Sequence, residues 1–131
     1  MEYVSTRGQA PVLGFADALL AGLARDGGLY VPAFWPRLDP AAFASFAGRR
    51  YADVAKAVIA PFVGDAIAPA DLEALIEDAY ATFRHPAVCP LVQLTEREWA
   101  LELFHGPTLA FKDVAMQLLA RLMDHILAAR G

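Results

Sequence analysis

Lys112 is the residue of this chain whose chemistry most needs an explanation. The chain has only two lysines, Lys56 and Lys112. The remaining long cationic side chains are arginines, which stay charged and form no imine, whereas a lysine amine becomes a nucleophile once its pKa is depressed. Lys112 lies where a short apolar strand, predicted to end at residues 103–104, turns into a helix.

The segment before Lys112 has the residue types that a reactive lysine needs. Gly106 permits close approach of the backbone, and Pro107 restricts the turn. Thr108 is predicted to cap the following helix or to hydrogen-bond near the site. The apolar residues 109–111 are predicted to exclude water, and a dry position beside the amides of a helix N-terminus disfavours the ammonium form of the amine. Without these neighbours, a lysine in such a place is most often a solvated helix residue.

Three stretches of the chain resemble the threonine synthase family, in the branch found in many bacteria and fungi. Residues 101–113, LELFHGPTLAFKD, resemble the family's cofactor-lysine motif. Residues 3–8, YVSTRG, and residues 22–32, GLARDGGLYVP, resemble its amino terminus. The three stretches stand in the order that the family shows. A complete threonine synthase is several times longer than this chain, so the resemblance implies that residues 1–131 form the amino-terminal domain of such a protein.

The resemblance also implies a chemistry. It implies a pyridoxal 5'-phosphate enzyme of fold-type II, with tryptophan synthase beta-like architecture, that converts O-phosphohomoserine and water to threonine and phosphate. Lys112 would be both the catalytic and the cofactor-binding residue, since it would hold the cofactor as a Schiff base and then transfer protons with its released amine. The family's glycine-rich loop for the cofactor phosphate and its remaining domain have no counterpart in residues 1–131. The isolated chain is therefore predicted to be inactive.

Ser5, Thr6 and Arg7 form a second candidate site, for the substrate. Two hydroxyls beside a guanidinium could bind the phosphate or the carboxylate of the substrate, because arginine offers a planar fork of donors to either anion. The alternative is a strand-to-turn segment with a surface arginine, since serine and threonine are ordinary turn residues. The residue types leave both interpretations open.

Composition narrows the range of partners. The chain has 131 residues, a common size for one domain, with a net charge of −4 and a pI near 5.2. This charge provides no basic surface, so nucleic acid is not an expected partner. No uninterrupted apolar run reaches the roughly 18 residues of a membrane span, and no membrane contact is predicted. The cytoplasm is the expected compartment.

The other residues that could bind a metal or react are expected to have structural roles. His85, His105 and His125 are too scattered in the sequence for a metal site, and no metal is predicted. His105 is expected to hydrogen-bond to nearby backbone, and Glu102, on the strand before it, is expected to face solvent. Cys89 is expected to be a small apolar group rather than a nucleophile.

The elements that must position these residues follow from prolines, glycines and apolar spacing. They predict a mainly helical α/β fold with a small β-hairpin. Helices are predicted at residues 15–24, 40–46, 51–62, 69 to about 83, and 112–130, and short strands at residues 3–5 and 29–31. The hairpin pairs residues 91–94 with residues 99–104 across a polar turn.

Three of the predicted helices carry apolar stripes that should be buried. The stripe of the first consists of Phe15, Ala18, Leu19 and Leu23. That of helix 69–83 consists of Leu72, Leu75, Ile76, Ala79 and Phe83, and that of the last helix of Ala115, Leu118, Leu119, Leu122 and Ile126. In the last helix, further apolar residues widen the stripe beyond one face: Met116, Met123 and Leu127. Something else should cover this second face, which predicts homodimerisation or aggregation of the isolated chain.

Two alternatives to a threonine synthase stay open. The first is a threonine synthase-like phospholyase, which would share the lysine and the cofactor but release phosphate without making threonine. The second is a noncatalytic helical domain that self-associates through its exposed apolar surface.

Overall fold

The computed structural model describes every residue from Met1 to Gly131. The helices are α1 (Phe15–Ala21), α2 (Pro40–Ser45), α3 (Tyr51–Val63), α4 (Pro69–Tyr80) and α5 (Asp113–Arg130), with a 3-10 turn η1 (Gly64–Ala66). The strands are β1 (Glu2–Ser5), β2 (Leu13–Gly14), β3 (Tyr30–Pro32), β4 (Leu91–Gln93) and β5 (Trp99–Leu101). The predicted mainly helical α/β fold with a small hairpin is confirmed.

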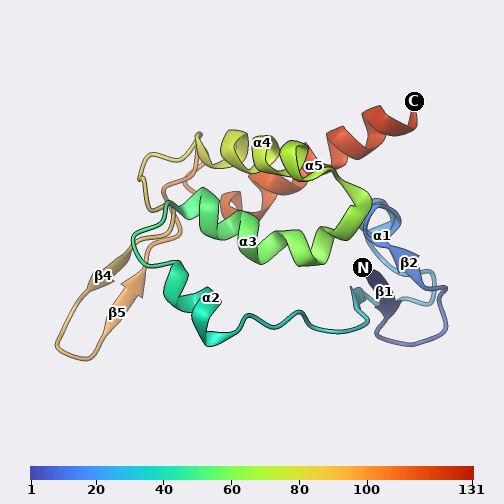
Figure 1. Cartoon of the computed structure of the whole chain (residues 1–131), viewed down its shortest axis with the longest axis horizontal. Helices are drawn as coiled ribbons and strands as arrows, with labels where there is room; N and C mark the ends of the chain where they lie inside the picture. The colour runs from blue at the N-terminus through green and yellow to red at the C-terminus, as the bar shows by residue number, and fades with distance from the viewer.

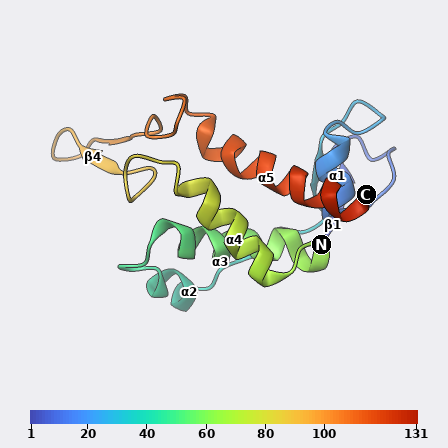
Figure 2. The ribbon, with the colours of Figure 1, turned by 90° about the horizontal axis from the view of Figure 1, so that it is seen from above.

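The core lies between α3, α4 and α5. Helix α4 packs against both of the others, and the three helices lie side by side in Figure 2. The apolar stripe predicted for α4 supplies its centre, because Leu72, Ile76 and Ala79 are all buried. From α5, Leu118, Leu122 and Ile126 join the same cluster. Phe83, by contrast, lies beyond the end of α4 and is half-buried, since the helix stops at Tyr80.

A three-stranded antiparallel sheet of order β2-β1-β3 stands beside α1. The predicted strands at residues 3–5 and 29–31 correspond to β1 and β3, which pair Val4 with Val31. Strand β2 was not predicted, because two residues are too short to show a period. Tyr3 joins this sheet to α3 by donating its hydroxyl to the Phe62 carbonyl at 2.8 Å.

Helix α1 is shorter than predicted. It ends at Ala21, not at residue 24, because Gly22 adopts a left-handed backbone with φ of 65°. Leu23, expected on the buried face, therefore lies outside the helix, where it forms an isolated bridge with Leu29 and is 66% exposed. Gly22, rather than the later pair Gly27–Gly28, ends this helix.

The predicted hairpin is present as β4 and β5, which pair Val92 with Ala100. Strand β5 ends at Leu101 rather than at residue 104. Figure 1 shows the hairpin projecting from one end of the helical body, while the β2-β1-β3 sheet lies at the opposite end. Most of the hairpin's apolar side chains are exposed, because only two strands are present and no other element covers them.

One face of α5 is uncovered. Met116 and Leu127 are 49% and 51% exposed, and Leu119 and Met123 are only half-buried. Ala115, predicted to be buried, is exposed as well, because α4 and α1 contact other sides of the helix. The second apolar face predicted for this helix therefore exists and has no cover within the chain. Neither α5 nor any other helix combines the length and the apolar character that a membrane crossing requires.

Candidate functional site

Lys112 stands at the start of α5, as predicted. It is the residue before the first helical position and is exposed to solvent. Its amine takes part in none of the ion pairs of the chain, whereas the amine of Lys56 pairs with Glu73. The main chain of Lys112 is anchored in the helix, since its carbonyl accepts from Ala115 at 3.1 Å and from Met116 at 2.8 Å. The structure thus combines a fixed backbone with a free amine.

An apolar hollow of about 480 Å³ lies beside Lys112. Its other lining residues are Leu103, Phe111, Val114, Ala115 and Met116. Such a wall fits one face of an aromatic cofactor ring, and the unpaired primary amine next to it fits covalent attachment of an aldehyde. The predicted exclusion of water is not seen, because Leu109 and Phe111 are 55% and 66% exposed. No segment of this chain covers them.

The carboxylate of Asp113 holds the loop in front of Lys112. Asp113 is 4% exposed, and its Oδ2 accepts from the Thr108 amide at 2.8 Å and from the Thr108 hydroxyl at 2.9 Å. Loss of hydration raises the pKa of Asp113, but the hydrogen bonds to its carboxylate, from Thr108 first and then from Gln117 and the Ala110 backbone, together outweigh it and lower the pKa. The first of the two roles predicted for Thr108, a cap of the following helix, is therefore not observed, because α5 has no side-chain cap. Thr108 donates to an acid inside the helix.

Close packing at Gly106 confirms the prediction for this glycine. A Cβ atom at Gly106 would overlap the side chain of Asp113. Three residues on, Leu109 has a φ of 63°, a left-handed conformation that is uncommon outside glycine. The loop from Gly106 to Leu109 is therefore compact and tightly specified.

His105 and Glu102 differ from their predicted roles. The Nε2 atom of His105 lies 2.7 Å from Oε2 of Glu102, and both side chains are largely buried. The expected backbone partner of the His105 ring is thus replaced by a carboxylate. Glu102 does not face solvent, because β5 ends at Leu101 and the backbone after it no longer alternates.

Ser5, Thr6 and Arg7 already have partners within the fold. The Ser5 hydroxyl donates to Asp26 Oδ1 at 2.8 Å and accepts from the Arg7 amide at 3.1 Å. The Thr6 hydroxyl accepts from the Leu29 amide at 3.0 Å. The Arg7 guanidinium donates through Nη1 to the Asp26 carbonyl at 2.9 Å. The two hydroxyls organise a turn, and the exposed guanidinium of Arg7 retains free donors for an anion.

Asp26 is the centre of this turn. Its Oδ2 accepts from the amides of Gln9 at 3.0 Å and Ala10 at 2.9 Å, and its Oδ1 accepts from Gly28 at 2.9 Å. Loss of hydration raises its pKa, but these hydrogen bonds outweigh that and lower the pKa to about 2. Sequence reasoning assigned residues 25–28 to the end of a helix and missed this role. The available signal was an aspartate directly before two glycines, a typical turn pattern.

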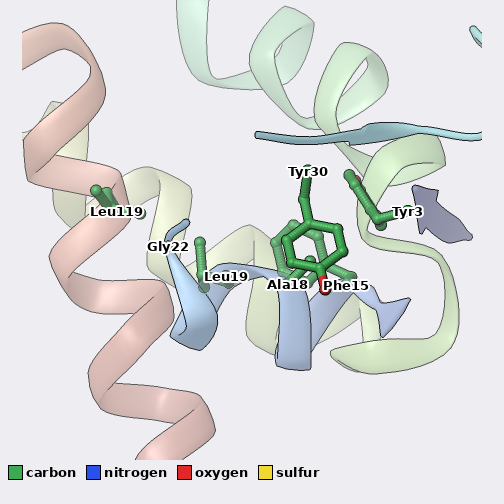
Figure 3. A pocket seen from close by; sticks show the side chains of 7 residues that line it. All are labelled: Tyr3, Phe15, Ala18, Leu19, Gly22, Tyr30 and Leu119. Carbon is green, nitrogen blue, oxygen red and sulfur yellow. The ribbon is translucent and has the colours of Figure 1, made fainter. Parts of the chain in front are cut away.

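The structure does not bring the two candidate sites together. Lys112 begins α5 on the side of the hairpin, whereas Ser5 ends β1 in the sheet at the other end of the body (Figures 1 and 2). Figure 3 shows what lies beside β1 instead, an apolar pocket of about 320 Å³ that includes Tyr3, Tyr30 and Leu119 of α5. Farther along α5, Arg130 pairs with Asp17 of α1 at 2.6 Å.

Comparison with known proteins gives consistent matches over the whole chain. Residues 2–80 match the family model described as the threonine synthase N terminus. The threonine synthase of Pseudomonas aeruginosa is 59% identical over 131 residues, which are 100% of this chain and 28% of that protein. The threonine synthase-like 2 protein of Rattus norvegicus is 41% identical, over 97% of this chain and 26% of that protein.

A solved structure gives the same result. The crystal structure of pyridoxal phosphate (PLP)-bound threonine synthase from Brucella melitensis superposes with a TM-score of 0.98 at 63% identity, over 100% of this chain and 28% of that one. The chain thus spans little more than a quarter of the length of the proteins that it matches. Because the family model covers more than half of the chain and the fold agrees throughout, this chain belongs to the threonine synthase family.

Proposed function

We propose that this chain is the amino-terminal part of a threonine synthase, which converts O-phosphohomoserine and water to threonine and phosphate. The observation that carries the proposal is the free amine of Lys112 beside an apolar hollow at a helix N-terminus, in a chain of this family. Residues 1–131 act as one amino-terminal unit that lacks the phosphate-binding loop, so the unit by itself is inactive. The cytoplasm is the proposed compartment.

The proposed cofactor is pyridoxal 5'-phosphate, which the related Brucella melitensis protein binds. When bound, this cofactor withdraws electrons from the substrate carbons. The proposed role of Lys112 is to attach the cofactor covalently through Nζ and then to carry protons to and from the substrate. The apolar residues that line the hollow, among them Phe111 and Met116, would contact one face of the bound cofactor.

The proposed function is tested with a full-length chimaera. In it, this chain replaces the matching 131 residues of the Pseudomonas aeruginosa threonine synthase. Threonine and phosphate formed from O-phosphohomoserine in equal amounts would support a threonine synthase. Phosphate without threonine would identify the phospholyase alternative. If neither threonine nor phosphate forms, the threonine synthase and the phospholyase are both contradicted.

We propose that Ser5, Thr6 and Arg7 contribute to substrate binding: Ser5 and Thr6 hold the turn that presents Arg7, and the Arg7 guanidinium contacts an anionic group. Replacement of Arg7 with alanine in the chimaera should raise KM about tenfold or more and change kcat much less. The variant can no longer form the charged hydrogen bond that Arg7 makes when the substrate binds. Arg25→Ala is the matched control, since Arg25 is exposed in the same turn. Steady-state kinetics with equal KM values for the two variants would remove this role.

The isolated 131-residue chain is proposed to form a homodimer through the uncovered face of α5. Substitution of both Met116 and Leu127 with glutamate should raise the dimer dissociation constant about 100-fold or more, because each charge would be buried without a partner. Exposed alanines of α4 give a matched control with two added carboxylates, Ala70→Glu with Ala74→Glu. Sedimentation velocity measures both. A wild-type chain that stays monomeric at high concentration would contradict the dimer.

A further inference from the structure

We propose that Asp113 is a positioning residue for Lys112. Its carboxylate accepts two hydrogen bonds from Thr108 and so holds the loop from Gly106 to Leu109 against the first turn of α5. These two hydrogen bonds are called the clasp below. The inference rests on the proposed function, since it assigns a role toward the reaction of the Lys112 amine. Asp113 itself is not proposed to touch cofactor or substrate.

The burial of Asp113 is the first observation. It is the only charged residue of the chain whose side chain is buried, although an acid in the first turn of a helix usually remains in water. Burial of a carboxylate costs free energy unless hydrogen bonds replace its hydration. Here Thr108 supplies two of them, from its amide at 2.8 Å and from its hydroxyl at 2.9 Å. The side chain of Gln117 adds a weaker contact at 3.4 Å.

The shape of the loop is the second observation. At Gly106 a Cβ atom would overlap Asp113, so the loop passes directly over the carboxylate. Leu109 holds a φ of 63°, which costs conformational energy for a residue with a side chain. Such a conformation persists when its surroundings specify it. Within this loop, the clasp between Asp113 and Thr108 is the side-chain interaction that does so.

Lys112 is held between the clasp and the helix. On one side, the Asp113 amide donates to the Ala110 carbonyl at 3.0 Å, and on the other the Lys112 carbonyl accepts from Met116 at 2.8 Å. The Lys112 side chain has no partner of its own, so the direction in which it leaves the backbone depends on these neighbours. Loosening of the clasp would release the loop before Lys112 and spread the positions of its amine.

The experiment uses the full-length chimaera and four variants. Asp113→Asn and Thr108→Val weaken the clasp, Thr108→Ser keeps the hydroxyl, and Asp71→Asn is the control, an exposed acid in the first turn of α4. Each protein is incubated with pyridoxal phosphate and reduced with borohydride, and the labelling rates of Lys112 and Lys56 are measured by peptide mass spectrometry. Hydrogen exchange of the Thr108 amide reports the clasp directly.

Asp113→Asn and Thr108→Val are expected to slow the labelling of Lys112 by about 10 to 100-fold, because a displaced reactive group loses its favourable geometry. Labelling of Lys56 should not change, exchange of the Thr108 amide should accelerate, and kcat should fall with KM nearly constant. Thr108→Ser should restore the rate to within about threefold of wild type, and Asp71→Asn should match wild type, because neither change removes the clasp.

Three results would overturn the inference, and they are distinguishable. Wild-type labelling at Lys112 with equal labelling in Asp113→Asn and Thr108→Val would refute the positioning role and leave the proposed function intact. Absence of selective labelling at Lys112 in the wild-type chimaera would refute the proposed function, and the positioning role with it. If the role of Asp113 is purely structural, Asp113→Asn should slow the labelling of both Lys112 and Lys56 and reduce the helical circular dichroism. That result also counts against the inference.

Discussion

Replacement of Lys112 with arginine in the full-length chimaera is expected to lower kcat by about 1000-fold or more. Arginine keeps the positive charge and the length of the side chain, but its guanidinium neither forms an imine nor gives up its proton near neutral pH. Both proposed roles of the residue are therefore lost, whereas the exposed position of Lys112 lets the larger side chain fit without disturbance of the core. The rates at which the chimaera forms threonine and releases phosphate measure the effect.

Lys56→Arg is the matched control for this substitution. Lys56 lies on α3 and pairs with Glu73 across the surface, far along the chain from the hollow, and arginine can keep that pair. The control should retain activity within about twofold, since surface ion pairs contribute little. Activity of the Lys112→Arg chimaera near that of the control would show that this lysine is neither the attachment point nor a proton carrier.

The second large effect is expected in the core. Ile76→Ala in the 131-residue chain should lower the free energy of unfolding by about 2 to 5 kcal/mol, because the change removes buried methyl groups and leaves a cavity. Ile76 is 1% exposed and belongs to the cluster that joins α3, α4 and α5. Urea unfolding, followed by helical circular dichroism, measures the change.

Leu94→Ala is the control for the core substitution. Leu94 follows β4 and is 66% exposed, so its truncation should change the free energy of unfolding by about 0.5 kcal/mol or less. Equal effects of the two substitutions would mean that α4 is not packed between α3 and α5. An Ile76→Ala chain that is unfolded without urea would agree with the prediction, because small domains have little stability to lose.

Several elements were predictable because their signals act over a few residues. The Asp39–Pro40 pair starts α2, and the Asp39 carboxylate accepts from the Ala42 amide at 2.7 Å as a helix cap does. The stripe of Leu72, Ile76 and Ala79 predicted α4 and its buried face. The position of Lys112 at the start of α5 was equally readable. Caps and apolar periods depend on neighbours within one or two helical turns.

Other features depend on residues far apart in the chain and escaped prediction. Asp26 accepts from the amides of Gln9 and Ala10, more than 15 residues earlier, and no local pattern names such partners. The pairing of β1 with β2 has the same origin, since it depends on which segments meet around the sheet. A backbone hydrogen bond shows in the sequence only when its two ends are close.

The amino-acid sequence alone was enough to assign the family, most of the helices and the position of Lys112 at the start of α5, because these rest on motifs and short-range periods. Only the tertiary structure determined which polar side chains have hydrogen-bond partners within the chain. The hydroxyls of Ser5 and Thr6 form hydrogen bonds within a turn around Asp26 and Leu29, while the amine of Lys112 stays unpaired. Asp113 became buried beneath Thr108. The availability of a hydrogen-bonding group depends on every segment that packs around it, and only the three-dimensional arrangement specifies those segments.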